Sequence, residues 1–133
     1  ILGIILSLLL TACSQQSLAT AAPNSGTALL QVINHSNSPI HTIELNFYQN
    51  GMLVSTQGGA YANGSALKNG DFLDFQLISH DIDFNQPVTI EATVTINNQD
   101  ILIGSVQSVQ VTRGNVFNFE IIGSSSKLIF KMM

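Results

Sequence analysis

The sequence predicts an all-β protein, in which an antiparallel β-sandwich of about seven strands follows a short apolar leader and a linker. Three observations support this fold class. Hydrophobic and polar residues alternate over several short stretches, turn-forming residues separate those stretches, and no segment shows the hydrophobic period of an amphipathic helix. The 133 residues suffice for one folded domain in addition to the leader.

The clearest predicted strand is VTIEATVTI, residues 88–96, in which every second side chain is hydrophobic. One face of such a strand is buried and the other contacts water. Residues 42–49 alternate in the same way and are followed by Asn50-Gly51. Asn-Gly between two hydrophobic stretches favours a two-residue hairpin turn, because both residues tolerate positive φ.

Five further stretches are predicted strands: Leu29–Asn34, Met52–Thr56, Phe72–Ile78, Ile101–Val111 and Asn115–Ile122. Within residues 101–111 the alternation changes phase near Gly104 and again near Ser108, which indicates a β-bulge or a strand that changes sheets. The last residues, KLIFKMM, alternate hydrophobic and basic side chains. We expect 127–133 to form a final edge strand protected by lysines, rather than the end of a fragment.

The leader, ILGIILSLLL at residues 1–10, is too short to cross a bilayer as a helix, since that takes about 20 residues. It is typical of the hydrophobic region of a secretory signal peptide. The chain begins without Met and without a basic flank, so we expect that the start of the leader is missing. The predicted organisation is a signal peptide over 1–12, truncated at its N-terminus, a linker over 13–27 and the sandwich over 28–133.

The leader ends in Leu10-Thr11-Ala12-Cys13, and Cys13 is the only cysteine. This tetrapeptide resembles the lipobox of bacterial lipoproteins. The resemblance implies that the Cys13 thiol carries a diacylglycerol and anchors the mature protein to a lipid bilayer. The likeness to enteric lipoproteins also implies where the protein is sorted, because in those proteins an Asp directly after the lipidated Cys marks retention in the inner membrane. Because this chain has Ser14 at that position, we expect sorting to the outer membrane, with the domain facing the periplasm. A surface lipoprotein of a Gram-positive bacterium is the alternative.

Residues 14–27 are rich in Ser, Ala, Gln and Thr and carry no charge, which is typical of a flexible tether. As a coil, this segment would span about 20 Å. We therefore expect the domain to lie just outside the lipid headgroups.

A second resemblance covers about residues 29–77, which are similar to the immunoglobulin-like modules of bacterial lipoproteins of the FxLYD type. The shared layout is a strand ending in Asn-x-Ser, a strand ending in aromatic-Tyr before a Gly turn, and Leu-x-x-Gly before a further strand. The matching residues are Asn34, Ser36, Phe47, Tyr48, Gly51, Leu67, Gly70 and Phe75. A competing likeness is the transthyretin-like sandwich of the outer-membrane lipoprotein of type VI secretion, which shares the lipobox, the size and an aromatic-Tyr-Gln strand end.

Composition argues against several function classes. Four Lys and Arg stand against eight Asp and Glu, a net charge of −4, and the basic residues are scattered or terminal. Nucleic-acid binding needs a clustered basic face, so we expect no nucleic-acid partner. No Gly-x-Ser-x-Gly elbow, phosphate-binding loop or dinucleotide fingerprint occurs in the sequence. We expect no enzyme activity and no cofactor.

Half of the acidic residues fall within thirteen positions around His80. Among them Asp81 and Asp83 are weak candidates for binding calcium, although the spacing of an EF-hand loop is absent. His35 and His41 show no metal-ligand spacing with His80. We expect solvated loop carboxylates and exposed histidines, and no metal.

The longest irregular segment is TQGGAYANGSALKNG, residues 56–70, in which the Asn-Gly and Gly-Gly pairs favour tight turns and mobility. Tyr61 is the large amphipathic side chain in this segment, and we expect it to be exposed. Loops on a rigid scaffold often bind partners, and Tyr offers contact area at low entropic cost. Tyr61 and Asn63 are therefore candidate partner-binding residues. The alternative, a mobile connection between two sheets without a binding role, is slightly favoured.

The sequence as a whole predicts a membrane-anchored envelope lipoprotein that acts as a non-catalytic binding or scaffolding module for an envelope protein. Two alternatives stay open. One is a transthyretin-like lipoprotein of a type VI secretion membrane complex, and the other is a metal-dependent envelope hydrolase.

Overall fold

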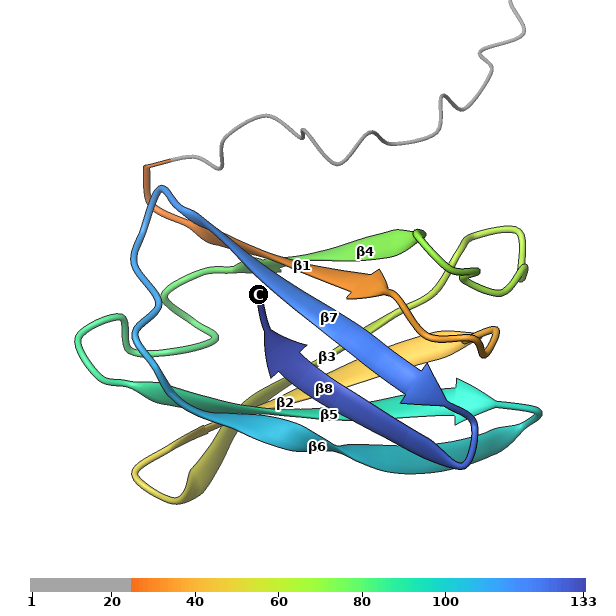
Figure 1. The fold of residues 1–133 in the computed structure, drawn as a ribbon. Helices are drawn as coiled ribbons and strands as arrows, with labels where there is room; N and C mark the ends of the chain where they lie inside the picture. The colour runs from red at the N-terminus through yellow and green to blue at the C-terminus, as the bar shows by residue number, and fades with distance from the viewer. Residues whose placement is uncertain (1–24) are drawn as a thin grey trace, which may run out of the picture.

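The computed structural model describes residues 25–133 as two four-stranded β-sheets that face each other (Figure 1). One sheet has the strand order β4-β1-β7-β8 and the other the order β3-β2-β5-β6. The strands are β1 (Ala28–Asn34), β2 (Thr42–Gln49), β3 (Met52–Gly59), β4 (Phe72–Leu77), β5 (Val88–Ile96), β6 (Gln99–Val109), β7 (Val116–Ser124) and β8 (Lys127–Met132). The predicted all-β sandwich is confirmed, and β8 is the expected final edge strand.

The strict alternation of hydrophobic residues in β5 has the predicted result. Every hydrophobic side chain of this strand is buried and every polar one is half-buried. The strand pairs with β2 on one side and β6 on the other, so it lies inside its sheet. The hairpin between β2 and β3 turns at Asn50 and Gly51, whose φ angles of 53° and 75° agree with the predicted turn.

Strand β3 is longer than the sequence predicts, since it continues past Thr56 to Gly59. The extension pairs Gly59 with Ile43 of β2. Glycine is disfavoured in strands by propensity, but here its missing side chain leaves room for close neighbours. A Cβ at Gly59 would lie 3.2 Å from side-chain atoms of both Leu73 and Phe75 on β4.

The phase changes in β6 are β-bulges, one of the two readings that the sequence allowed. The β5–β6 register shifts between Val88 and Ile90 and again between Ala92 and Thr93. On β6 these shifts fall beside Ser108 and Gly104, which have φ angles of 54° and 126°. The strand bends but stays within one sheet.

One strand pair is parallel. β1 pairs with β7 in parallel, whereas all other neighbouring strands are antiparallel. In addition, β1 and β2 lie in different sheets. The immunoglobulin order places the first two strands in one sheet, so this sandwich does not have that order.

The core fills the space between the sheets. Its largest fully buried side chains include Phe47 of β2 and Phe119 of β7. Phe119 stacks on Phe130 of β8 with ring centroids 5.3 Å apart. The core is therefore built from both sheets, as a sandwich requires.

The sandwich has two ends, which we call proximal and distal. The proximal end is where β1 begins: Thr27 accepts a hydrogen bond from the N–H of Gly114, in the loop before β7. That loop in turn reaches the β4–β5 loop, because the Gln110 amide donates to the carbonyl of Phe84. The β4–β5 loop contacts the β2–β3 hairpin, where the Gln49 amide donates to the carbonyl of Asp83. These segments lie together on the left in Figure 1.

The distal end is opposite. It carries the β1–β2 loop (35–41), the β3–β4 loop (60–71) and the two short turns that precede β6 and β8. We call residues 35–41 and 60–71 the distal loops.

Candidate binding surface

The distal loops are held to each other rather than lying free. Ile40 and Leu67 form an isolated antiparallel bridge, in which each N–H donates to the other residue's carbonyl at 3.0 and 2.7 Å. Both side chains are completely buried in the core. The two loops therefore pack as one layer across the end of the sandwich.

Asn34, the last residue of β1, organises this layer and is itself completely buried. Its side-chain amide donates to the carbonyls of Ser38 and Leu67, each at 2.9 Å. Its side-chain oxygen accepts from the N–H and the hydroxyl of Ser36, at 3.0 and 2.6 Å. The Asn34 side chain thus makes four hydrogen bonds, two through its nitrogen and two through its oxygen. These bonds connect both distal loops.

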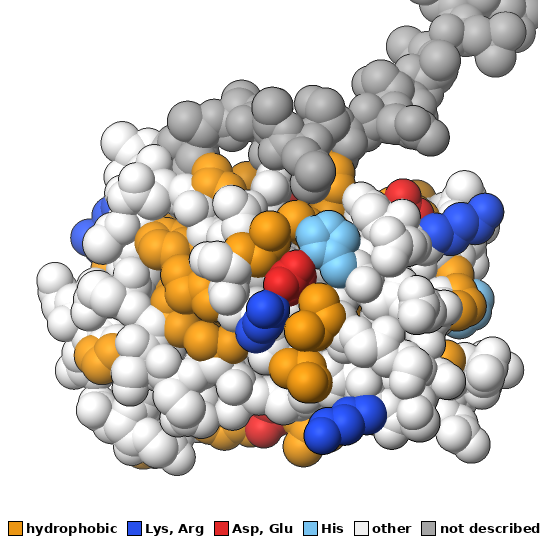
Figure 2. Space-filling model, in the orientation of Figure 1, with side chains coloured by type: hydrophobic (Ala, Val, Ile, Leu, Met, Phe, Trp, Pro, Cys, Tyr) orange, Lys and Arg blue, Asp and Glu red, His pale blue; other side chains and the backbone are white. Residues whose placement is uncertain are grey.

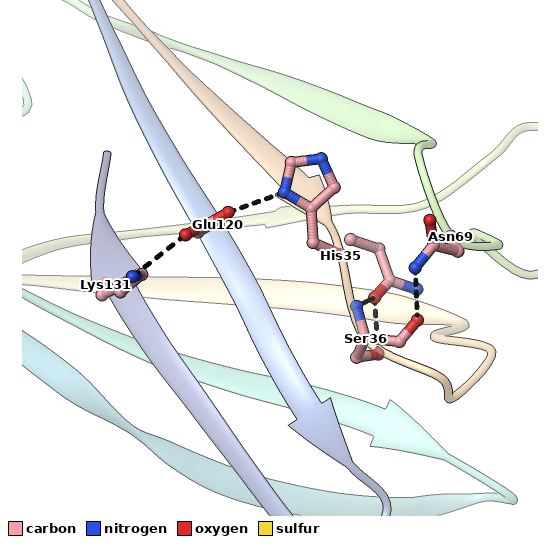
Figure 3. A network of polar contacts seen from close by, with 6 residues as sticks. His35, Ser36, Asn69, Glu120 and Lys131 are labelled. Atoms are coloured by element: carbon pink, nitrogen blue, oxygen red, sulfur yellow. Dashed lines mark hydrogen bonds and ion pairs between the residues drawn. The ribbon is translucent and has the colours of Figure 1, made fainter.

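Two further bonds close the connection. The Asn69 amide donates to the carbonyl of Ser36 at 3.1 Å (Figure 3). The N–H of Gly70 donates to the carbonyl of Asn34 at 2.7 Å. Gly70 has a φ of 92°, which glycine adopts without strain. The predicted turn at Asn69-Gly70 is therefore present, and it docks against the first loop.

Tyr61 is not the exposed side chain that the sequence predicts. It is half-buried and packs against the hydrophobic core. Burial raises the pKa of its hydroxyl, and Asp71 raises it further through its charge and a hydrogen bond. The expectation was wrong because the loop folds back over the edge of the core, which an irregular sequence pattern does not reveal.

Asn63 lies at the exposed tip of the second distal loop. Its side-chain oxygen accepts from the N–H and the hydroxyl of Ser65, at 2.9 and 2.7 Å, and Gly64 follows it with a φ of 77°. This is the tight turn that the Asn-Gly pair predicts. The amide nitrogen of Asn63 has no hydrogen-bond partner among residues 25–133, and the side chain is exposed to solvent.

A charged group lies beside the distal loops on the outer face of the β4-β1-β7-β8 sheet. Glu120 of β7 contacts the Nδ1 atom of His35 at 2.6 Å and the Nζ atom of Lys131 at 3.3 Å. The hydrogen bond from His35 is the main reason that the pKa of Glu120 is lowered, and Lys131 lowers it further against the opposing effect of burial. Figures 2 and 3 show this group, and hydrophobic side chains surround it in Figure 2.

The acidic residues of HDID lie at the proximal end, away from the distal loops. Asp81 accepts a hydrogen bond from the N–H of Ile78, and Asp83 accepts one from the N–H of Asn85. Both carboxylates thus cap turns of the β4–β5 loop. Within residues 25–133 no three His, Cys, Asp or Glu side chains are grouped so that they could hold a metal ion.

The structure does not bring the three histidines together. His35 is engaged with Glu120, and the other two, His41 and His80, are exposed at opposite ends of the sandwich. Cys13, the predicted lipidation site, lies outside the residues that the structure describes.

Sequence reasoning missed the central role of Asn34. The signal was present, because Asn34-x-Ser36 is a sequence in which the Asn side chain can bond to the main chain two residues later. What the sequence could not show is the contact with Leu67, since that contact is set by how the β3–β4 loop returns.

Comparisons with known proteins give only remote likenesses. No family model matches the sequence, and no curated protein matches it. The membrane-binding domain of pneumolysin is 9% identical with a TM-score of 0.44, covering 80% of this chain and 96% of that one. Suilysin from Streptococcus suis is 8% identical with a TM-score of 0.45, covering 80% and 23%. The human-specific toxin intermedilysin is 7% identical with a TM-score of 0.43, covering 80% and 23%.

The chain thus spans about a quarter of the length of the full-length toxins that it matches. A likeness of this size carries no argument about what the chain does.

Proposed function

We propose that this chain is a lipid-anchored protein of the bacterial cell envelope that binds a protein partner through its distal loops and catalyses no reaction. Attachment is through the lipobox cysteine, Cys13. The observation that carries the binding role is the buried Asn34 amide, which joins the two distal loops into one rigid layer.

A rigid layer is what a binding surface requires. Loops that are already ordered lose little conformational entropy when a partner binds, so more of the contact free energy appears as affinity. Here the ordering comes from within the domain, through the Ile40–Leu67 bridge and the Asn69–Ser36 bond. The polar tips of the loops stay exposed, Asn63 and Lys68 among them.

The position of the layer also supports the proposal. The chain joins β1 at the proximal end, so a lipid at Cys13 is connected to that end, and the distal loops are at the other. An anchored domain would then present the distal loops to the aqueous compartment. Their exposed polar side chains are three amides, two imidazoles, one hydroxyl and one lysine, which suits a polar, hydrogen-bonded protein interface.

A second candidate is the transthyretin-like lipoprotein of a type VI secretion membrane complex. Two observations favour it: the strand order departs from the competing immunoglobulin order, because β1 and β2 lie in different sheets, and β2 ends in Phe47-Tyr48-Gln49, the aromatic-Tyr-Gln end that the two sandwiches share. In that case the partner of the distal loops is a component of the secretion complex. Co-purification of the chain with that complex from membranes, or its absence, separates this candidate from the general proposal.

The anchor is tested by metabolic labelling with a fatty acid. The protein with a complete leader should incorporate the label and partition into detergent, and Cys13→Ser should abolish both. Continued labelling of the Ser variant refutes lipidation at this position.

The binding surface is tested by capture of partners from native envelopes. Asn63→Arg combined with Lys68→Glu changes exposed side chains at the loop tips without touching the Asn34 network. Ser79→Arg, an exposed change at the proximal end, is the matched control. The double variant should lose the partners that wild type and Ser79→Arg retain. Equal recovery by all three proteins contradicts a role for the distal loops.

A further inference from the structure

We propose that the tip of the β2–β3 hairpin contacts the surface of the same bilayer that holds the Cys13 lipid. This inference extends the proposed anchor, and it adds a second attachment point that nothing in the lipobox implies. The contact is between Met52, Leu53 and Val54 and the interfacial region of the lipids.

The tip carries the most exposed consecutive hydrophobic residues in the part of the chain that the structure describes. Met52 is 70% exposed, Leu53 55% and Val54 43%. Neighbouring residues of a strand point to opposite faces, so the tip is hydrophobic on both faces. A partner that packs on one face of the sheet would therefore leave part of the tip exposed. A surface into which the tip inserts would cover all three side chains.

The tip of the hairpin also lacks charge. No Asp, Glu, Lys or Arg occurs between Glu44 and Lys68, so the whole of β3 is uncharged. Exposed edge strands are usually protected by lysines or prolines against pairing with other chains. The tip of β3 has neither. A contact with lipid therefore requires no charged group of the hairpin to lose its hydration.

The tip lies at the end of the domain that faces the anchor. The Gln49 amide donates to the carbonyls of Asp83 and Gln86 and ties the hairpin to the β4–β5 loop. That loop is joined through Gln110 to the β6–β7 loop, which bonds to Thr27 at the start of β1. The hairpin and the start of β1 therefore belong to one bonded proximal end (Figure 1).

The length of chain before β1 keeps this end near the bilayer. Fourteen residues separate Cys13 from Ala28, and they reach at most about 50 Å at roughly 3.3 to 3.6 Å per residue. An acylated Cys13 thus holds the proximal end within a distance at which a protruding hairpin meets the headgroups.

The contact stays in the interfacial region. β3 is an edge strand, so its outer row of N–H and C=O groups has no neighbouring strand. Such groups cannot enter hydrocarbon without a large cost. Asn50, at the turn, also bonds to the side chain of Gln86 and stays polar. The hydrophobic side chains can reach the boundary of the acyl chains while the backbone stays among headgroups and water.

Charge at the proximal end does not drive this contact. Arg113 lies there, 4.5 Å above the ring of Phe84, but Asp81 and Asp83 lie in the adjacent loop. Because the signs are mixed, attraction to anionic lipids is weak, and the contact should respond little to salt.

Tryptophan scanning tests the proposal, because the chain contains no Trp. Leu53→Trp places a reporter at the tip. Leu102→Trp is the matched control, since Leu102 is a hydrophobic residue of an edge strand that is 61% exposed. Each mature lipoprotein is reconstituted into vesicles of phosphatidylethanolamine and phosphatidylglycerol, with or without lipids brominated near the headgroup. Unchanged thermal unfolding shows that the variants fold.

We expect a blue shift and quenching by bromolipid for Trp at position 53, at low and at high salt, and neither for Trp at position 102. Absence of quenching at position 53 in protein that mass spectrometry shows to be acylated overturns the hairpin contact and leaves the anchor intact. Equal quenching at both positions overturns it as well, because the domain would then lie flat on the bilayer. If Cys13 carries no lipid, the proposed anchor fails. The hairpin contact is then tested by adding vesicles to the unacylated protein and measuring the blue shift and quenching of Trp at position 53.

Discussion

The side-chain amide of Asn34 donates a hydrogen bond of 2.9 Å to the main-chain carbonyl of Leu67, 33 residues later in the chain. Asn34 is the last residue of β1, Leu67 lies in the β3–β4 loop, and both are completely buried. A buried amide that bonds to the main chain in this way fixes the position of the loop that it contacts. The distal surface therefore depends on a residue that lies beneath it.

Asn34→Ala should lower the free energy of unfolding by about 2 to 3 kcal/mol, because the carbonyls of Ser38 and Leu67 and the hydroxyl of Ser36 lose a buried partner. Hydrogen exchange at the N–H groups of Ile40 and Leu67 should become faster. Asn37→Ala, an exposed change in the same loop, is the control and should leave both unchanged. Chemical denaturation and amide exchange measure these effects.

Val94→Asp should unfold the domain or nearly so. Val94 is completely buried between the sheets, and an unpaired buried carboxylate costs several kcal/mol against a total stability of about 5 to 15 kcal/mol. The neighbouring Thr93 faces outward opposite Glu44, so the neutral change Thr93→Asn is the control and should be nearly silent. Far-UV circular dichroism during thermal unfolding decides the point. A folded Val94→Asp protein would contradict the predicted strand faces.

Asp74→Asn should stabilise the domain at neutral pH by at most about 1 kcal/mol, because the carboxyl is only partly buried and solvent screens it. The Oδ1 atom of Asp74 is buried without a hydrogen-bond partner among the described residues, and burial raises the pKa of this carboxyl against the opposing effect of Gln31. A raised folded-state pKa means that ionisation destabilises the fold as the pH rises above the ordinary value of 3.8. The gain from Asn should therefore vanish in acid below 3.8. A gain that is independent of pH would point to another cause.

Glu120→Gln should have the opposite dependence on pH. The hydrogen bond from His35 lowers the pKa of Glu120, so the charged form stabilises the fold above the ordinary value of 4.5, and this contribution is lost as the pH falls through the folded-state pKa. At neutral pH the variant should be less stable by about 0.5 to 1 kcal/mol, a small effect because solvent screens the group. The difference from wild type should disappear in acid, as denaturant titrations at several pH values would show.

Much of the fold was predictable because, in a strand with one buried face, hydrophobic and polar residues alternate along the sequence. The β5 strand and the Asn50-Gly51 turn are examples, and even the bulges in β6 were visible as breaks of phase at Gly104 and Ser108. The C-terminal end of β3 was not predictable, because glycine is disfavoured in strands by propensity. The close packing of Phe75 against Gly59 is a contact with the other sheet, which the local sequence does not reveal.

The candidate surface was predictable only in part. The sequence indicated the β3–β4 loop and its turns at Asn63 and Asn69, which depend on local chemistry. It predicted the wrong environment for Tyr61, since packing of that ring depends on how the loop crosses the core edge. The parallel pairing of β1 with β7 is likewise a property of the whole chain and leaves no mark in either strand.

Photocrosslinking in intact cells reports directly which end of the anchored domain meets a protein. A benzophenone amino acid is placed at Asn63 in the distal loops or at Ser79 at the proximal end, both of which are exposed. If the distal loops bind the partner, position 63 should give a discrete crosslinked protein and position 79 should give none. Crosslinks to the same proteins from both positions, or from position 79 alone, would contradict binding through the distal loops.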